Sequence, residues 1–359
     1  MRAAPLTAVP LGRSLGGMAS TPATTARLPW HHSLKTRIAL WFGLIASAAA
    51  AAGGMALYAQ AERRALADAE AAGLRELRRA TAETRALLQA VEVSAGTLAH
   101  AQAAVAGDAA RTEALLEATV LSEPNSAGGL VALLPAHSPT PGTLWARHAA
   151  ELGDGIAMTD LVERGLDVPG QAWFRDTLAA DGPRWSAPYF NDSAGGRWMV
   201  TLNQPLLAAG TSAGMVSLDV PIDRFNEPLA AFRSDARLRA GLHKGALWIV
   251  DSGWLSIGTL PPAAPGFDAQ RERLSGITGP TSTGDGMYPL DDGQRGRHEP
   301  LGDGWGLMVV LDERAVLAPL RQATWRFVGA TIVVIALLAL LSNALARGIT
   351  RPMVQLGDA

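Results

Sequence analysis

The chain of 359 residues has no cysteine and few charged side chains. Without cysteine it cannot hold a disulfide framework, a thiolate metal site or a cysteine nucleophile. Charged residues make up 18% of the sequence, which is below the roughly 25% of ordinary soluble domains. The mean hydropathy of +0.13 lies above zero, and the net charge of −2 argues against a nucleic-acid-binding protein, whose binding domain is basic. Together these values indicate membrane-spanning segments.

Two stretches lack charged residues altogether. Residues 38–59 form 22 consecutive uncharged positions, and a helix of that length spans about 33 Å, enough for a hydrocarbon core of about 30 Å. A second uncharged run, 327–346, is richer in isoleucine, leucine and valine. We predict transmembrane helices over 36–59 and 326–346. A cleaved signal peptide is the alternative for the first run, although its apolar stretch exceeds the usual length of about 7–15 residues.

Acidic residues are missing from the N-terminal end of the chain. Residues 1–59 carry five basic residues and no acidic one, whereas residues 60–326 hold 24 basic and 32 acidic residues, a net charge of −8. Because Lys and Arg near the ends of spans favour the cytoplasmic side, we expect both termini in the cytoplasm and the long segment outside. The predicted location is a bacterial inner (plasma) membrane, crossed twice. Residues 1–35 are expected to form a disordered cytoplasmic tail.

A stretch without proline or turn clusters follows the first apolar run. It is rich in Ala, Leu, Arg and Glu, which are good helix formers, and predicts one long helix over 60–105. One interpretation of its apolar pattern is a helix packed only on its own domain. The other is a helix that also pairs with a second subunit, and on it we expect a homodimer. The pattern is a seven-residue a/d seam through Leu74, Leu77, Thr81, Thr84, Leu88, Val91, Ala95 and Leu98.

Short apolar runs separated by Gly, Pro, Asp and Ser fill the rest of the segment and predict two sheet domains, 106–221 and 222–323. The fold class is α+β, with a long N-terminal helix and two PAS-like antiparallel-sheet domains in tandem, flanked by two transmembrane helices. Helices are expected over 110–118, 171–180, 222–233 and 313–323. Strands are expected over 129–134, 143–148, 184–190, 197–205 and 213–220, and then over 246–250, 255–258, 286–289, 296–301 and 306–311.

One family matches the order of these elements. Residues 59–326 resemble a double-Cache (tandem PAS-like) extracellular sensor, the outer part of chemoreceptors, sensor histidine kinases, cyclic-dinucleotide synthases and sporulation-type serine phosphatases. The resemblance is specific in 106–221 and loose in 222–323. It rests on Trp173-Phe174, on the segment Trp-Ser-Ala-Pro-Tyr-Phe-Asn at 185–191, on Gly-Gly-Arg-Trp-Met-Val-Thr at 195–201, on Gln204-Pro205 and on Ser-Leu-Asp-Val at 217–220.

The last residues resemble the opening of a HAMP linker, in which an Ile-Thr-x-Pro step at 349–352 starts the first helix. Because such linkers are much longer than residues 347–359, we expect a truncated protein or a fragment. The resemblance then implies an output domain beyond the chain: a phosphatase, histidine kinase, cyclic-dinucleotide synthase or chemotaxis rod. Within this resemblance, the sequence of residues 195–201 weakly favours a serine/threonine phosphatase of the sporulation type. The alternative is a membrane-anchored binding module that has no output domain and signals through a partner protein.

No catalytic motif occurs in the sequence. A P-loop, a Gly-x-Ser-x-Gly elbow and a His-Glu-x-x-His helix are all missing. The seven histidines show no metal-ligand spacing. We therefore expect no catalytic residue, no metal and no cofactor in this chain, and we disfavour a membrane-anchored hydrolase.

The resemblance implies a small-molecule pocket in 106–221. Amino-acid-sensing members hold the ligand's carboxylate with an arginine two residues before the tryptophan, and its ammonium group with aspartates and aromatic faces. Here Gln171 stands at the arginine position, so the bidentate carboxylate clamp is lost. We predict an amine or small polar ligand, and not a typical α-amino acid. The candidate ligand-binding residues are Trp173, Tyr189 and Asp219, which match the family, and Phe174, Asn191 and Gln171, which depart from it; the aromatic ones could alternatively be core.

Overall fold

The computed structural model describes residues 34–153, 155–191, 196–245, 247–251, 286–290 and 293–356. The chain divides into two units, Met1–Gln60 and Ala61–Ala359. The first contains the start of helix α1 (Leu34–Val105), and the second contains the rest of α1 and all other elements. The predicted tail up to residue 33 and the predicted strand 255–258 lie outside the described residues.

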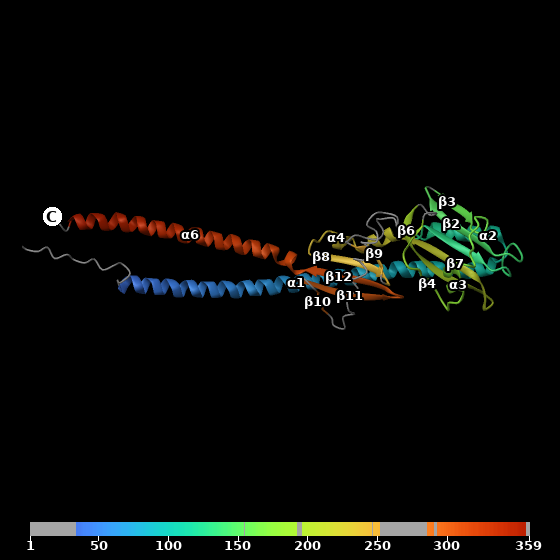
Figure 1. Ribbon diagram of the computed structural model, residues 1–359, viewed down its shortest axis with the longest axis horizontal. Coiled ribbons are helices and arrows are strands. Elements are labelled where there is room, and N and C mark those ends of the chain that lie inside the picture. The colour runs from blue at the N-terminus through green and yellow to red at the C-terminus, as the bar shows by residue number, and fades with distance from the viewer. Residues whose placement is uncertain are drawn as a thin grey trace, which may run out of the picture. The chain divides into compact units, whose positions relative to one another are not determined.

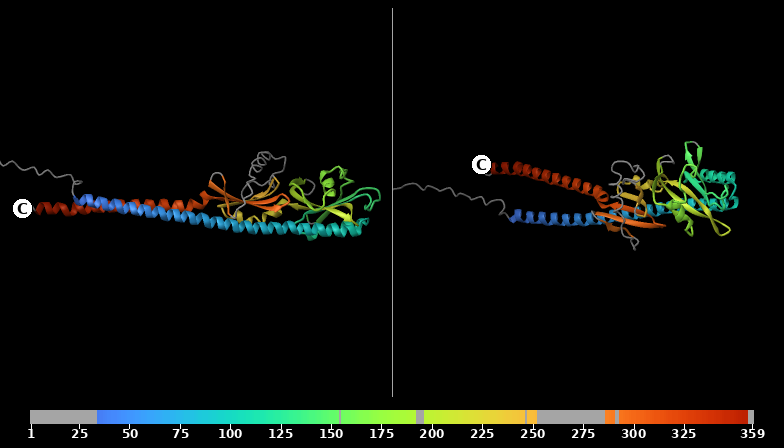
Figure 2. Two further views of the ribbon diagram at one scale, coloured as in Figure 1. Left: turned by 90° about the horizontal axis from the view of Figure 1, so that it is seen from below. Right: turned by 45° about the vertical axis from the view of Figure 1, so that its right-hand side comes forward.

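Helix α1 contains the helix predicted over 60–105. From residue 61 on it runs along both sheets (Figures 1 and 2). Of the eight predicted seam residues, seven are buried and Leu74 packs against the same core. The seam therefore packs on the chain's own sheets, as the first interpretation holds. Pairing with a second subunit stays a prediction, and it would need a different face of α1.

Sheet A has seven antiparallel strands in the order β3-β2-β1-β7-β6-β4, with β5 also paired to β6. Helix α1 and helix α2 (Ala109–Ser122) pack on one face, and α3 (Ala172–Leu178) packs on the other. The strands are β1 (Gly128–Leu133), β2 (Trp145–Leu152), β3 (Gly155–Asp160), β4 (Arg184–Trp185), β5 (Tyr189–Asn191), β6 (Arg197–Ala208) and β7 (Thr211–Pro221).

Two details of sheet A differ from the prediction. The strand expected over 184–190 is two short strands, β4 and β5, because Pro188 between them has no N–H to donate to the ladder. Strand β3 is not among the predicted strands. It extends β2 as a hairpin at the sheet's edge.

Sheet B has five antiparallel strands in the order β10-β11-β12-β8-β9. Its β8 was not predicted. The helix expected over 222–233 is also broken, because Pro228 interrupts it between the 3-10 helix η3 (Ile222–Asn226) and α4 (Ala230–Arg233). The strands are β8 (Leu238–Lys244), β9 (Leu247–Asp251), β10 (Tyr288–Leu290), β11 (Gln294–Gly302) and β12 (Trp305–Asp312).

The two sheets repeat one topology. In each, the first and last strands, β1 with β7 and β8 with β12, pair at the centre. The second strand lies outside the first in both sheets. Outside the last strand lie β6 and then β4 in sheet A, and β11 and then β10 in sheet B. This repeat confirms the predicted fold class: two PAS-like antiparallel sheets in tandem behind a long helix.

Helix α6 (Glu313–Leu356) leaves sheet B directly after β12 and contains the second predicted span. It continues without a break to Leu356, so the residues that resemble a HAMP opening prolong the helix. By length and composition, parts of α1 and α6 are long and apolar enough to cross a membrane. Large apolar side chains are exposed along both, as expected for surfaces that face lipid; they include Trp41, Leu44, Ile45, Met55 and Leu57 in α1, and Trp325, Phe327, Ile332, Ile335 and Leu340 in α6.

Candidate ligand-binding site

The face of sheet A that meets α3 is unusually polar. Side chains alternate between the two faces of a strand. On β7, Val216 and Leu218 belong to the core formed with α1 and α2, while Ser217 and Asp219 point to the opposite face. On the neighbouring β6, Thr201 and Asn203 point the same way as their β7 partners. Four polar side chains are thereby buried side by side.

A cavity of about 350 Å³ lies over this polar face. It falls within the range of small-molecule pockets, which are mostly apolar with a few fixed polar groups. One side is apolar and comes from β1, the turn after β3, and α3; the other is polar. The lining residues are Leu130, His148, Leu161, Leu166, Trp173, Ser186, Tyr189, Asn191, Thr201, Asn203, Ser217 and Asp219.

Asp219 is the centre of a hydrogen-bond network in the cavity wall. Its Oδ1 accepts from Thr201 Oγ1 at 2.7 Å and lies 3.5 Å from the Tyr189 hydroxyl. The Tyr189 hydroxyl also lies 2.8 Å from Thr201 Oγ1. On the other side, Asp219 Oδ2 lies 2.9 Å from His148 Nε2, and the two form an ion pair when the imidazole is protonated. The carboxylate is only 4% exposed, so these partners offset the cost of burying it.

Burial and these partners act in opposite directions on the carboxyl group. Burial alone would raise the pKa of Asp219, but the hydrogen bond and charge of His148, with the hydroxyls of Thr201 and Tyr189, bring that pKa below its ordinary value. For Tyr189, burial foremost and then the nearby Asp219 charge raise the pKa of the phenol far above its ordinary value. The site therefore presents a carboxylate next to a neutral phenol at neutral pH.

Four of the six predicted residues line the cavity: Trp173, Tyr189, Asn191 and Asp219. Two do not. Phe174 is buried in an apolar cluster beneath α3, and its ring meets Trp173 edge-on at 6.0 Å. Gln171 precedes α3 and donates its amide to the Asp167 carbonyl at 3.1 Å. Their positions relative to Trp173 explain this, because residues one or two positions away on or directly before a helix point in different directions.

The sequence analysis did not propose five of the lining residues as ligand contacts: His148, Ser186, Thr201, Asn203 and Ser217. A period-2 signal was available for three of them. Thr201 with Asn203, and Ser217 with Asp219, place polar side chains at alternate positions of otherwise apolar strands. His148 gave no such signal, since only the pairing of β2 with β1 carries it to the same face.

Part of the chain matches a known family. Residues 112–227 match the family model described as methyl-accepting chemotaxis protein-like, first PDC sensor domain. This part of the chain is a Cache-type sensor domain. We refer to residues 112–227 as the Cache domain. No curated protein matches the sequence.

Solved structures of sensor domains share the fold over most of the chain. The chain is similar to the extracellular domain of a protein assigned as histidine kinase soHK1S-Z6, with a TM-score of 0.52 and 18% identity over 72% of this chain and 98% of that one. It is also similar to the periplasmic sensory domain of the Campylobacter jejuni chemoreceptor Tlp1, with a TM-score of 0.51 and 10% identity over 71% and 99%. A third is methyl-accepting chemotaxis protein X, with a TM-score of 0.50 and 14% identity over 69% and 99%.

The matched family consists of sensor domains. Cache domains sense and do not catalyse. In this chain the Cache domain lies between two helices apolar enough to span a membrane, which is the arrangement of a transmembrane receptor. Within the described ranges, no group of three or more His, Cys, Asp or Glu side chains could hold a metal ion.

Proposed function

We propose that the Cache domain binds an amine or another small polar solute outside the cytoplasm, and that the chain carries this signal across the membrane. The observation that supports the ligand class is the charge of the cavity wall. Asp219 is its one carboxylate, and no Lys or Arg is among the described residues that line it. A carboxylate ligand would meet Asp219 without a guanidinium to balance it, whereas an ammonium group would gain a charge-assisted hydrogen bond.

The aromatic and hydroxyl groups support the same class. Trp173 offers a ring face for a cation, and Tyr189, Asn191 and Ser217 offer hydrogen bonds that could orient a small polar molecule. We therefore assign ligand contact to Trp173, Tyr189, Asn191 and Asp219. Phe174 of α3 and Gln171, which directly precedes α3, do not line the cavity and support the site indirectly.

For transmission we propose that α6 carries the change inward. It is joined to β12 without a loop and continues through the second apolar run to Leu356. The basic, acid-free N-terminal segment supports an orientation with both termini in the cytoplasm. The resemblance of residues 346–356 to a HAMP opening supports delivery of the signal to such a linker, and the receptor acts as a homodimer.

The test is a thermal-shift screen of the detergent-solubilised full chain against a library of amines, neutral polar compounds and α-amino acids. We expect hits among the amines or neutral polar compounds. Replacing Asp219 by Asn keeps the shape of the side chain and removes its charge, so an amine hit should lose about tenfold or more in affinity.

The matched control is Asp223→Asn, which removes an equal charge from an exposed position of helix η3 and should leave every Kd unchanged. Stabilisation by α-amino acids alone would contradict the proposed ligand class. Equal affinities in the parent chain and the Asp219→Asn variant would remove Asp219 from the site.

A further inference from the structure

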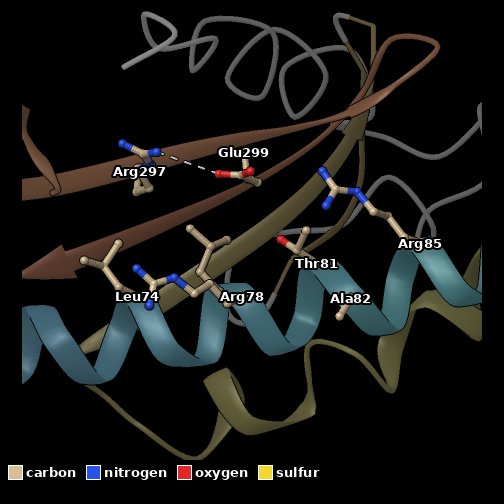
Figure 3. A pocket seen from close by; sticks show the side chains of 8 residues that line it. Leu74, Arg78, Thr81, Ala82, Arg85, Arg297 and Glu299 are labelled. Atoms are coloured by element: carbon tan, nitrogen blue, oxygen red, sulfur yellow. Dashed lines mark ion pairs between the residues drawn. The ribbon is translucent and has the colours of Figure 1, made fainter. Parts of the chain in front are cut away.

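A second cavity, separate from that of the Cache domain, lies between α1 and β11. Its volume is about 360 Å³. We call it the arginine groove, after the three arginines that line it: Arg78 and Arg85 from α1, and Arg297 from β11 (Figure 3). One carboxylate, that of Glu299, is the only acidic group among the described lining residues. The described lining residues thus include three positively charged side chains and one negatively charged one.

The helix spacing places these groups on one side of α1. Arg78, Thr81 and Arg85 stand at positions i, i+3 and i+7, which share a helix face. Figure 3 shows them projecting from α1 on the side where β11 presents Arg297 and Glu299. The groove is thus assembled from two elements that lie more than 200 residues apart in the sequence.

The contacts of the three arginines differ. Arg297 lies 3.9 Å from Glu299, a long ion pair, and donates to the Gly286 carbonyl at 3.3 Å. Arg85 donates to the Pro300 carbonyl at 3.0 Å. Within the described part of the chain, neither Arg78 nor Arg85 forms an ion pair with a carboxylate. Two guanidinium groups on one side of the groove, neither paired with a carboxylate among the described residues, attract an anion.

A buried hydroxyl gives a second, independent indication of a ligand. Thr81 is only 5% exposed and lines the groove, yet its Oγ1 has no hydrogen-bond partner among the described residues. A buried hydroxyl without a partner costs about 1–3 kcal/mol. An acceptor oxygen in the groove would satisfy it.

From these observations we propose that the arginine groove binds a small oxyanion, such as a phosphate, a sulfate or a multivalent carboxylate. Guanidinium groups match the geometry of such anions with paired hydrogen bonds, and the Thr81 hydroxyl would donate one more. The anion would bridge α1 and β11 and so fix the long helix against sheet B. This site is independent of the ligand proposed for the Cache domain.

The experiment is calorimetric titration of the full chain in lipid-free detergent with sodium phosphate, sodium sulfate and sodium citrate, at constant ionic strength set by NaCl. We expect at least one of them to bind saturably and to raise the melting temperature. Binding without phospholipid identifies a free solute as the source; binding that appears only after anionic lipid is added would overturn the assignment to a small solute.

Four variants test the residues. Arg297→Gln should weaken oxyanion binding about tenfold or more, because a charge-assisted hydrogen bond is lost. Arg75→Gln, an exposed arginine of the same helix outside the groove, is the matched control and should change Kd less than twofold. Glu299→Gln should strengthen binding, since it removes a like charge. Thr81→Val should weaken binding several-fold while leaving the anion-free protein at least as stable.

The expected gain of affinity in Glu299→Gln is a control for folding, because a variant that only disturbs the fold would not bind the anion more tightly. The proposal fails if none of the three anions binds at millimolar concentration, or if Arg75→Gln weakens binding as much as Arg297→Gln does. Asp219→Asn should leave oxyanion affinity unchanged. A failure of the oxyanion proposal can therefore be distinguished from a failure of the proposed amine site.

Discussion

Asp219 links four strands of sheet A through its carboxylate. It lies on β7 and is bonded to Thr201 on β6, to His148 on β2 and, more weakly, to Tyr189 on β5. Removing one partner from a buried network leaves another polar group unsatisfied, which costs more than the bond itself contributes. The stability of the Cache domain and the shape of its cavity therefore depend on the same few atoms.

Tyr189→Phe tests the outer end of this network. The variant loses the 2.8 Å hydrogen bond to Thr201 but keeps the ring, and Thr201 still donates to Asp219. We expect a loss of about 1 kcal/mol in the free energy of unfolding, measured by urea denaturation of the full chain in detergent. A change of more than about 3 kcal/mol would mean that the hydroxyl has a larger structural role than this network gives it.

His148→Gln tests the electrostatic partner of Asp219. The hydrogen bond and charge of His148 help to keep the pKa of Asp219 below its ordinary value, so this carboxylate stabilises the folded state above its unfolded pKa of about 3.9. That stability is lost as the pH falls through the folded pKa. In the variant the folded pKa rises, and we expect the acid-induced loss of stability to begin at a higher pH. Denaturation curves between pH 7 and pH 3.5 measure the shift, and superimposable profiles of parent and variant would contradict it.

Among the elements, the strands of sheet B bring two histidines together. His243 on β8 and His298 on β11 stack with their ring centroids 5.0 Å apart and their Nε2 atoms 2.8 Å apart. Because His243 Nδ1 lies 2.9 Å from the Gly245 carbonyl, that nitrogen is the donor, and in the neutral pair His298 donates to His243 through Nε2.

The pair predicts a pH dependence of stability. Burial, foremost, lowers the pKa of both His243 and His298 in the folded chain. Their unfolded pKa is about 6.5, so on acidification the unfolded chain takes up protons before the folded one does. Stability is thus complete above about pH 6.5 and declines below it. His298→Gln should reduce the decline in unfolding free energy between pH 7.5 and pH 5.5; an unchanged decline would contradict it.

Two glycines, Gly306 between these histidines and Gly96 of α1, should respond in opposite ways to substitution by alanine. A Cβ on Gly306 of β12 would overlap Nε2 of both rings, whereas a Cβ on Gly96 of α1 would meet nothing. Gly306→Ala should lower the free energy of unfolding by about 1–3 kcal/mol. Gly96→Ala should raise it by roughly 0.5–1 kcal/mol, because alanine favours the helix. Thermal denaturation of both variants checks the two signs, and stabilisation by Gly306→Ala would contradict the close packing of the histidines.

At the same scale, the sequence predicted α1 and most strands, but it did not predict two strands and one helix break. The α1 seam and strands β6, β7, β11 and β12 follow their hydrophobic period, since each has one face or both faces in a core. The features that were not predicted are strands β3 and β8 and the helix break at Pro228. In these segments a sheet edge, a neighbouring strand or a single proline decides the structure, and the local pattern does not reveal which.

At the scale of the whole molecule, one core joins the two sheets. A single apolar cluster includes residues of α1, sheet A and sheet B. At the junction, Trp185 of sheet A meets Trp305 of sheet B edge-on at 5.6 Å and donates its indole N–H to Glu92 of α1 at 3.0 Å. Asp303, beside β12, accepts from the Trp185 backbone N–H at 3.2 Å. These contacts connect the Cache domain to the sheet that leads into α6.

Trp305→Ala tests this continuity. The side chain is 3% exposed, so its removal should cost about 3–5 kcal/mol. The variant removes the contacts of Trp305 that join the cores of the two sheets. We therefore expect residues 61–312 to unfold in two transitions in the variant and in one in the parent. Hydrogen exchange of the full chain, followed peptide by peptide, would show sheet A and sheet B opening together in the parent and apart in the variant. A lower stability with one cooperative transition would contradict the role of Trp305 as the link.

The sequence by itself determined the features that depend on local pattern. Runs without charge gave the apolar helices, the uneven distribution of acids gave the expected orientation, and period-2 and seven-residue patterns gave most of the sheets and the long helix. Tertiary structure alone decided which side chains share a cavity, because strand pairing and helix packing join residues far apart in the chain. Strand pairing places His148 beside Asp219, and the position of α3 leaves Phe174 and Gln171 outside the cavity. The packing of α1 on sheet B places Arg297 opposite Arg78 and Arg85.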